Sequence, residues 1–144
     1  MSTLKNDFIY NSYLVTRLFI KHMSISFKEV GHKILPEHWL ILALLSDGKD
    51  HNQQHIANQT VKDKATITRA IDQLIEKKFV KRTQNPEDRR ANLITLLPAG
   101  KKEVDTLMKI YQKMEKDILE ELSADEKKAT IAIFKRLIKR MELE

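Results

Sequence analysis

Residues 63–100 have the sequence DKATITRAIDQLIEKKFVKRTQNPEDRRANLITLLPAG. In the first part, apolar residues recur at helical spacing, and Asp63 stands where it can cap the helix. Residues 79–83 and 93–97 are β-prone runs, separated by turn-forming residues in 84–88. This stretch therefore predicts a helix followed by a β-hairpin with a charged tip. The residues expected on the inner side of the helix are Ala65, Ile67, Ile71, Leu74 and Ile75.

Another short helix is predicted directly before this one. Asp50 is followed three residues later by Gln53, the spacing of a capping box, and the helix would run to about Gln59 before a break at 60–62. Two short helices separated by a few residues are a helix-turn-helix candidate. Because a basic hairpin follows them at once, the three elements predict a winged helix.

The residues on the N-terminal side predict two more helices. Apolar residues at helical spacing from Leu4 to about Val30 predict a long helix that breaks near Gly31. Pro36 can begin the next helix, which is apolar nearly all round and ends at residues 47–48. We expect this helix to be buried centrally.

On the C-terminal side, helical spacing returns at Pro98, and Ser123 with Glu126 forms a capping box for a last helix. The predicted fold class is therefore mainly α with a small β-hairpin wing: a winged helix-turn-helix on a helical frame. We expect one domain over residues 1–144, because a chain of this length has room for one core of ordinary size.

The composition limits the possible functions. The chain has no cysteine, which excludes disulfides and thiolate metal sites. Residues 49–100 carry ten basic and six acidic side chains, and so hold +4 of the net charge of +6. A basic segment indicates a partner such as nucleic acid, although a merely solvated surface is the alternative. With no apolar stretch approaching the roughly 20 residues that span a bilayer, and no signal pattern at the N-terminus, we expect no membrane association and a cytoplasmic location.

A helix-turn-helix presents the N-terminal residues of its second helix to base edges in the major groove. Arg and Lys can pair with guanine acceptors, and Thr and Ala can contact the thymine methyl group. The alternative is an amphipathic helix with a solvated face. The helix residues that we predict to contact DNA are Lys62, Lys64, Ala65, Thr66, Thr68 and Arg69.

At the tip of the hairpin, Asp88 is followed by Arg89 and Arg90. An exposed turn with adjacent guanidinium groups can insert one of them into a narrow minor groove, and Asp88 could fix the inserted group. A surface ion pair of little energetic weight is the alternative. We predict that all three residues, together with Arg82 on the first strand, contact DNA.

Two stretches resemble the MarR (multiple antibiotic resistance regulator) family. Residues 88–96, with Gly100 after them, are similar to its wing signature D-x-R-x-x-x-x-x-L-T-x-x-G, and residues 65–82 are similar to its recognition helix and first wing strand. Leu97 departs from the family, which usually has Thr there, so the next helix must be capped in another way. The family also usually has Gly near Lys78, so a left-handed residue would fall on Lys78 or Phe79.

The resemblance implies a homodimeric DNA-binding regulator of transcription, which we expect to be a repressor. Its first and last helices would interlock, and two lobes would bind a pseudo-palindromic operator with half-sites about 34–36 Å apart. The segments would be a dimerisation helix in 1–35, the DNA-binding lobe in 36–97 and C-terminal dimerisation helices in 98–144. The terminal helices also carry more apolar residues than one small lobe can bury. The predicted interface residues are Phe8, Ile9, Ile131, Phe134, Leu137 and Ile138.

The resemblance also implies release from DNA by a small aromatic or anionic effector, bound between the dimer helices and the lobe. The alternative is that the aromatic candidates are core residues and that Arg17 is solvated. The candidate ligand-binding residues are Tyr10, Tyr13, Arg17, His38 and Trp39.

Other function classes have weaker support. We expect no enzyme and no cofactor, because the sequence has no Gly-rich phosphate loop, no G-x-S-x-G and no H-E-x-x-H. A metal-responsive regulator is one alternative, since His51 and His55 have the helical spacing of two ligands on one face; the five histidines are His22, His32, His38, His51 and His55. We adopt the other interpretation, in which His51 and His55 are surface residues and form no metal site. A winged helix that binds protein or RNA is a further alternative.

Overall fold

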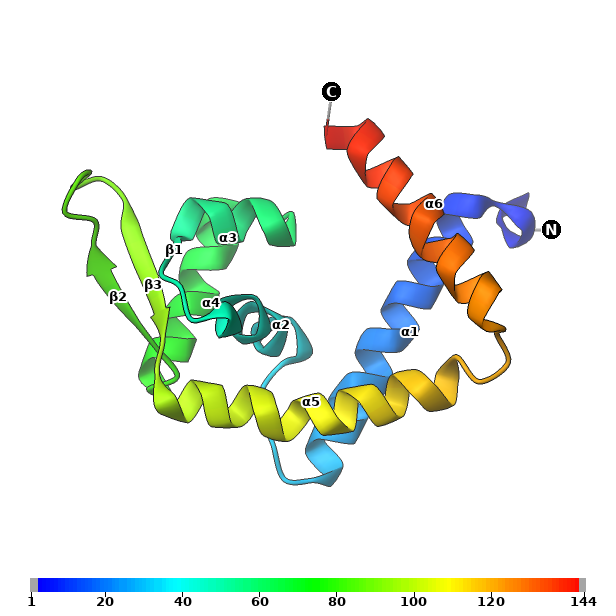
Figure 1. The fold of residues 1–144 in the computed structure, drawn as a ribbon, viewed down its shortest axis with the longest axis horizontal. Helices are drawn as coiled ribbons and strands as arrows, with labels where there is room; N and C mark the ends of the chain where they lie inside the picture. Colours follow the sequence, from blue (N-terminus) through cyan, green and yellow to red (C-terminus); the bar gives the residue numbers. More distant parts are fainter. Residues whose placement is uncertain (1–2, 143–144) are drawn as a thin grey trace. The chain divides into compact units, whose positions relative to one another are not determined.

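The computed structural model describes residues 3–142, so the outermost residues of the predicted segments 1–35 and 98–144 lie outside the described part. It is mainly helical with one small antiparallel sheet, which confirms the predicted fold class (Figure 1). The chain divides after Tyr111 into two compact units, which are described separately. The elements are η1 (Thr3–Asn6), α1 (Phe8–Glu29), α2 (Pro36–Leu44), η2 (Leu45–Asp47), β1 (His51–Asn52), α3 (Gln53–Thr60), α4 (Lys64–Glu76), β2 (Val80–Gln84), β3 (Asn92–Leu96), α5 (Pro98–Ile118) and α6 (Ala124–Glu142).

The first helix begins later than the apolar pattern indicated. Leu4 lies in a separate 3-10 turn, and α1 begins at Phe8 because Asp7 is extended and caps it, its Oδ1 accepting from the Tyr10 amide at 2.7 Å. After α1 the chain turns at Gly31, with a φ of +85°. This left-handed conformation explains why the predicted break falls there.

The start of α3 differs from the prediction. Asn52 is the cap, and its Oδ1 accepts from the Gln54 amide at 2.8 Å. Asp50 instead accepts a hydrogen bond from the Thr95 hydroxyl at 2.6 Å, so the predicted capping box is wrong. The reason is a third strand that the sequence did not reveal: β1 pairs His51 with Ile94 and Asn52 with Leu93, in a sheet of order β1-β3-β2.

The second helix of the helix-turn-helix, α4, begins as predicted. Asp63 caps it, with Oδ1 accepting from the Thr66 amide at 2.7 Å. Ala65 was expected on the inner side but is exposed, because it lies about 200° around the helix from Ile67. Ile75 is half-buried at the edge of the inner face. The fully buried residues of α4 are Ile67, Ala70, Ile71 and Leu74.

The end of α4 is a Schellman motif that sets the direction of the wing. The amides of Phe79 and Lys78 donate to the carbonyls of Leu74 at 3.0 Å and Ile75 at 2.9 Å. Lys78 has a φ of +60°, so the left-handed residue falls where the missing family glycine indicated.

The next helix packs tightly against this turn. The Leu97 amide donates to the Phe79 carbonyl at 2.9 Å, and α5 begins at Pro98 as predicted. A Cβ on Gly100 would overlap the same carbonyl oxygen, so only glycine fits the first turn of α5.

The core of the unit before residue 112 is centred on Trp39, which is 1% exposed. Its ring lies 5.5 Å from the Phe27 ring and 5.3 Å from the Tyr111 ring. The expectation that α2 is buried all round is only partly met, because Leu40 and Leu44 are 40% and 41% exposed. Helix α2 therefore has one open apolar side.

In the unit after Tyr111, α6 begins with the predicted capping box. The Ser123 amide donates to Glu126 Oε1 at 3.0 Å, and the Glu126 amide donates to Ser123 Oγ at 3.1 Å. Hydrogen bonding of its carboxylate with the amide and side chain of Ser123 holds the pKa of Glu126 below its ordinary value. Within residues 3–142, no helix has both the length and the apolar character needed to cross a bilayer.

Candidate nucleic-acid interface

The first turn of α4 presents basic groups to solvent. Lys62, Lys64 and Arg69 are exposed, as is Ala65. The side chain of Asp63 is occupied by capping, because its Oδ2 also accepts from the Thr66 hydroxyl at 2.9 Å, and these hydrogen bonds lower the pKa of Asp63. The α4 N-terminus therefore combines a fixed backbone with exposed cationic side chains.

Two of the predicted helix residues are half-buried and already hydrogen-bonded. The Thr68 hydroxyl donates to the Lys64 carbonyl at 2.8 Å and accepts from Gln53 Nε2 at 2.9 Å. The Thr66 hydroxyl donates to Asp63 and lies 3.4 Å from Arg69 Nη2. For these two threonines, the methyl groups are the parts best suited to contact DNA.

The tip of the wing is a turn ordered by its own side chains. Asn85 Oδ1 accepts from the Glu87 amide at 3.0 Å, and Gln84 Nε2 donates to the Arg89 carbonyl at 2.8 Å. We expected Asp88 to hold a guanidinium group; its Oδ1 instead accepts from the Arg90 amide at 3.0 Å. The guanidinium groups of Arg89 and Arg90 are exposed and form no ion pair within residues 3–142.

Arg82 lies in a different environment from the other predicted DNA contacts. Its Nη1 is 2.8 Å from Asp72 Oδ1 on α4, and its Nε donates to Gln53 Oε1 at 3.2 Å. Because the side chain is half-buried and bonded to two protein groups, it joins β2 to α3 and α4. The sequence pattern indicated Gln53 only as part of a capping box, and its observed side-chain partners lie 15 and 29 residues away.

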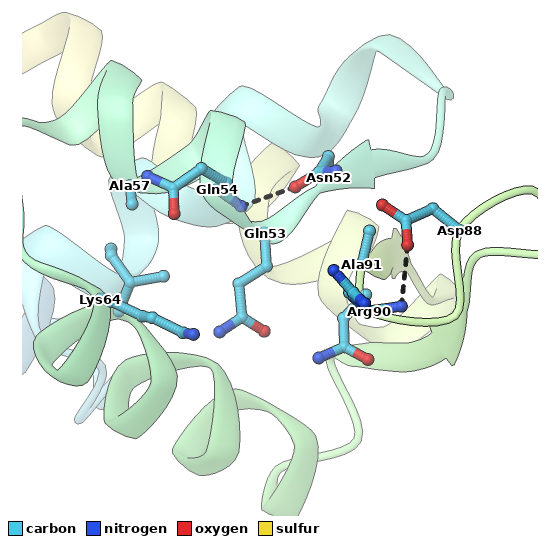
Figure 2. A pocket seen from close by; sticks show the side chains of 10 residues that line it. Asn52, Gln53, Gln54, Ala57, Lys64, Asp88, Arg90 and Ala91 are labelled. Atoms are coloured by element: carbon cyan, nitrogen blue, oxygen red, sulfur yellow. Dashed lines mark hydrogen bonds between the residues drawn. The ribbon is translucent and has the colours of Figure 1, made fainter.

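A cavity of about 270 Å³ lies between the start of α4, the start of α3 and the tip of the wing. We call it the wing cavity. In Figure 2 the amino end of Lys64 and the guanidinium end of Arg90 extend from opposite sides toward the Gln53 side chain. The polar lining of the wing cavity includes Asn52, Gln53, Gln54, Lys64, Arg90 and Asn92.

A larger hollow of about 720 Å³, here called the α2 hollow, opens beside α2 and α4. At its edge Lys62 Nζ is 3.4 Å from Glu37 Oε2. Burial and the positive charge of Lys77 lower the pKa of His38, while Glu37 acts in the opposite direction. The lining of the α2 hollow includes His38, Leu40, Leu44, Lys62, Thr66 and Arg69.

Of the candidate ligand-binding residues, His38 lies at the α2 hollow, but Tyr10, Tyr13 and Arg17 on α1 do not line it. Trp39 is part of the core, which agrees with the alternative that it has a packing role. The physical reason is that its indole fills the space between Phe27 and Tyr111.

The residues predicted for a dimer interface are exposed on their own helices. On α1, Phe8 and Ile9 are 54% and 71% exposed. On α6, no residue of Ala124–Glu142 is buried. The predicted α6 residues, all exposed, are Ile131, Phe134, Leu137 and Ile138.

The histidines do not form a metal centre in the described part of the chain. The rings of His51 and His55 are stacked with centroids 5.9 Å apart, and His51 Nε2 is 2.8 Å from Asp47 Oδ1, a hydrogen bond that lowers the pKa of Asp47. His32 Nδ1 is 2.7 Å from Glu103 Oε1. No group of three or more His, Asp or Glu side chains there is arranged to hold a metal ion.

Comparison with known proteins confirms the resemblance predicted from the sequence. Residues 34–91 match the model of the MarR family. The chain is 29% identical over 97 residues to the uncharacterized HTH-type transcriptional regulator YdgJ of Bacillus subtilis (strain 168), covering 67% of this chain and 59% of YdgJ. It is 30% identical over 105 residues to the HTH-type transcriptional repressor YetL of the same organism, covering 72% and 63%.

The fold is similar to that of S. aureus MepR in its DNA complex, with a TM-score of 0.82 and 20% identity; the likeness covers 94% of this chain and 99% of that chain. This likeness supports the winged-helix fold. This chain spans about three fifths of the length of YdgJ and of YetL.

Proposed function

We propose that this chain, which belongs to the MarR family through its winged-helix segment, is a transcriptional regulator that binds double-stranded DNA with sequence preference. The observation that carries the proposal is the convergence of free cations from two elements, Lys64 from α4 and Arg90 from the wing, on one polar cavity (Figure 2). Cationic groups without carboxylate partners are available to neutralise phosphates. The curated relatives YdgJ and YetL are a regulator and a repressor of the same helix-turn-helix type.

In this proposal α4 enters the major groove and the wing enters the adjacent minor groove. Arg69, which is exposed and contacts Thr66 on its own helix, reads base edges, while Arg89 and Arg90 bind the DNA backbone or the minor groove. Residues 36–97 form the DNA-binding lobe, and Arg82 acts by holding the wing strand against α4.

The chain acts as a homodimer on a pseudo-palindromic operator, with 1–35 and 98–144 as dimerisation segments. The support is the exposed apolar side of α1 and, separately, that of α6, which an isolated chain would leave in water. Two lobes held about 34–36 Å apart would reach successive major grooves. Repression follows if the operator overlaps a promoter.

A small effector releases the protein from DNA by occupying the α2 hollow. The hollow is lined by exposed apolar groups such as Leu40 and Leu44 and shares Lys62 and Arg69 with the proposed DNA-binding surface. An apolar anion bound there would compete with phosphate for Lys62.

Selection of bound duplexes from a random pool, followed by affinity measurements at several salt concentrations, tests the proposal. We expect an inverted repeat and an affinity that falls steeply with salt. Binding that is indifferent to sequence, or no binding at low ionic strength, would contradict it and would favour a winged helix that binds another kind of partner.

A further inference from the structure

We infer that the wing cavity is the seat of one DNA backbone phosphate, held jointly by Lys64 and Arg90. This inference rests on the proposed function and identifies the group on DNA that the cavity would take. It assigns to the two cations a single shared phosphate rather than separate contacts.

The position of the cavity follows from the geometry of the duplex. A major groove and the next minor groove are separated by one backbone strand. If α4 lies in the first and the wing in the second, that strand must pass between them. The wing cavity opens there, with Lys64 and Ile67 of α4 on one wall and Asp88, Arg90, Ala91 and Asn92 of the wing on another.

The chemistry of the lining suits a phosphate. Lys64 and Arg90 are exposed and have no ion pair within residues 3–142, so neither must leave a carboxylate to bind an anion. A guanidinium can donate two hydrogen bonds to phosphate oxygens, and an ammonium adds a compact positive charge. Asp88 also lines the cavity, but its Oδ1 already accepts from the Arg90 amide and thereby fixes the turn that carries the guanidinium.

The remaining wall is held in place before DNA arrives. The Gln53 side chain uses its Nε2 on Thr68 and its Oε1 on Arg82, so its amide is not a mobile competitor for the site. The volume of about 270 Å³ compares with roughly 30 Å³ for a water molecule in the liquid. The cavity therefore has room for a phosphate group together with some of its hydration.

The test replaces single phosphates of the selected duplex, one position at a time, by uncharged methylphosphonates. For the wild-type protein we expect one position in each half-site at which neutralisation weakens binding about ten- to hundredfold. In Lys64→Gln and in Arg90→Gln the penalty at that same position should fall below about threefold. Arg89→Gln is the matched control, because Arg89 belongs to the same turn but does not line the cavity, and it should keep the full penalty.

The inference would be overturned if Lys64→Gln and Arg90→Gln reduced the methylphosphonate penalty at different phosphates, or at none, in a duplex that the protein still binds. That outcome would leave the proposed function intact. A wild-type protein that binds no duplex at low ionic strength would instead overturn both. Thermal melting of each variant shows whether a change in binding reflects lost folding.

Discussion

The guanidinium of Arg82 on the first wing strand lies 2.8 Å from the carboxylate of Asp72 on the recognition helix. Its Nε also donates to Gln53 at the start of α3. One side chain thus joins β2, α3 and α4, which all belong to the proposed DNA-binding lobe. The orientation of the wing relative to α4 therefore depends on contacts inside the protein as well as on DNA.

Replacement of Arg82 should act mainly on stability and wing position. We expect Arg82→Ala to lower the free energy of unfolding by about 1–2 kcal/mol, because it removes a charge-assisted hydrogen bond and leaves the Oε1 atom of Gln53 without its Arg82 donor. Arg82→Lys keeps the positive charge but loses the planar guanidinium that contacts both Asp72 and Gln53, so it should recover little of the lost stability. Urea unfolding measures the effect. An unchanged stability combined with a salt slope lowered by about one unit would show that Arg82 binds phosphate directly.

Replacement of Lys78 by glycine should stabilise the fold. Its φ of +60° is unfavourable for a residue with a side chain, so Lys78→Gly should stabilise the fold by about 1 kcal/mol. Lys77→Gly, one residue earlier with a φ of −77°, is the control and should destabilise it. Thermal unfolding distinguishes the two variants, and destabilisation by Lys78→Gly would contradict the left-handed helix end.

Gly100 should not accept a side chain. Because a Cβ there would overlap the backbone carbonyl of Phe79, Gly100→Ala should destabilise the fold by about 1–3 kcal/mol as the α5 start is displaced. Ala99→Ser, on the exposed neighbouring position, should have little effect. Equal stability of the two variants in urea would show that α5 does not approach the turn so closely.

Much of the fold could be predicted from local patterns. The caps at Asp63 and Ser123 depend on groups within a few residues, so sequence spacing revealed them. The family resemblance indicated a left-handed residue at Lys78 or Phe79, and it is Lys78. The cap at Asn52 was missed because Asp50, the predicted cap, instead accepts a hydrogen bond from Thr95, 45 residues later. A two-residue strand such as β1 also carries no periodic signal.

For the candidate site, the sequence predicted which residues could bind DNA better than it predicted which of them lie together. The sequence identified Lys64 and Arg90 as cations available to DNA, but could not show that both line one cavity. Arg82 is as basic as they are, and only its long-range partners distinguish it.

Acidification should destabilise the protein partly through His38. Burial holds the pKa of His38 below 6.5, so the unfolded chain binds a proton more readily than the folded one. Stability from the neutral ring is therefore complete above pH 6.5 and is lost as the pH falls from there toward the folded pKa. Unfolding free energies from pH 7.5 to 5 should decrease less in His38→Gln. An NMR titration midpoint for His38 at or above 6.5 would contradict this.

The affinity of Arg90→Ala for the selected operator tests the central claim most directly. Arg90 is exposed and unpaired within residues 3–142, so its loss should leave the melting temperature nearly unchanged. We predict binding at least about tenfold weaker, as expected for loss of a charge-assisted contact. An affinity equal to that of the wild-type protein would remove the wing from DNA recognition.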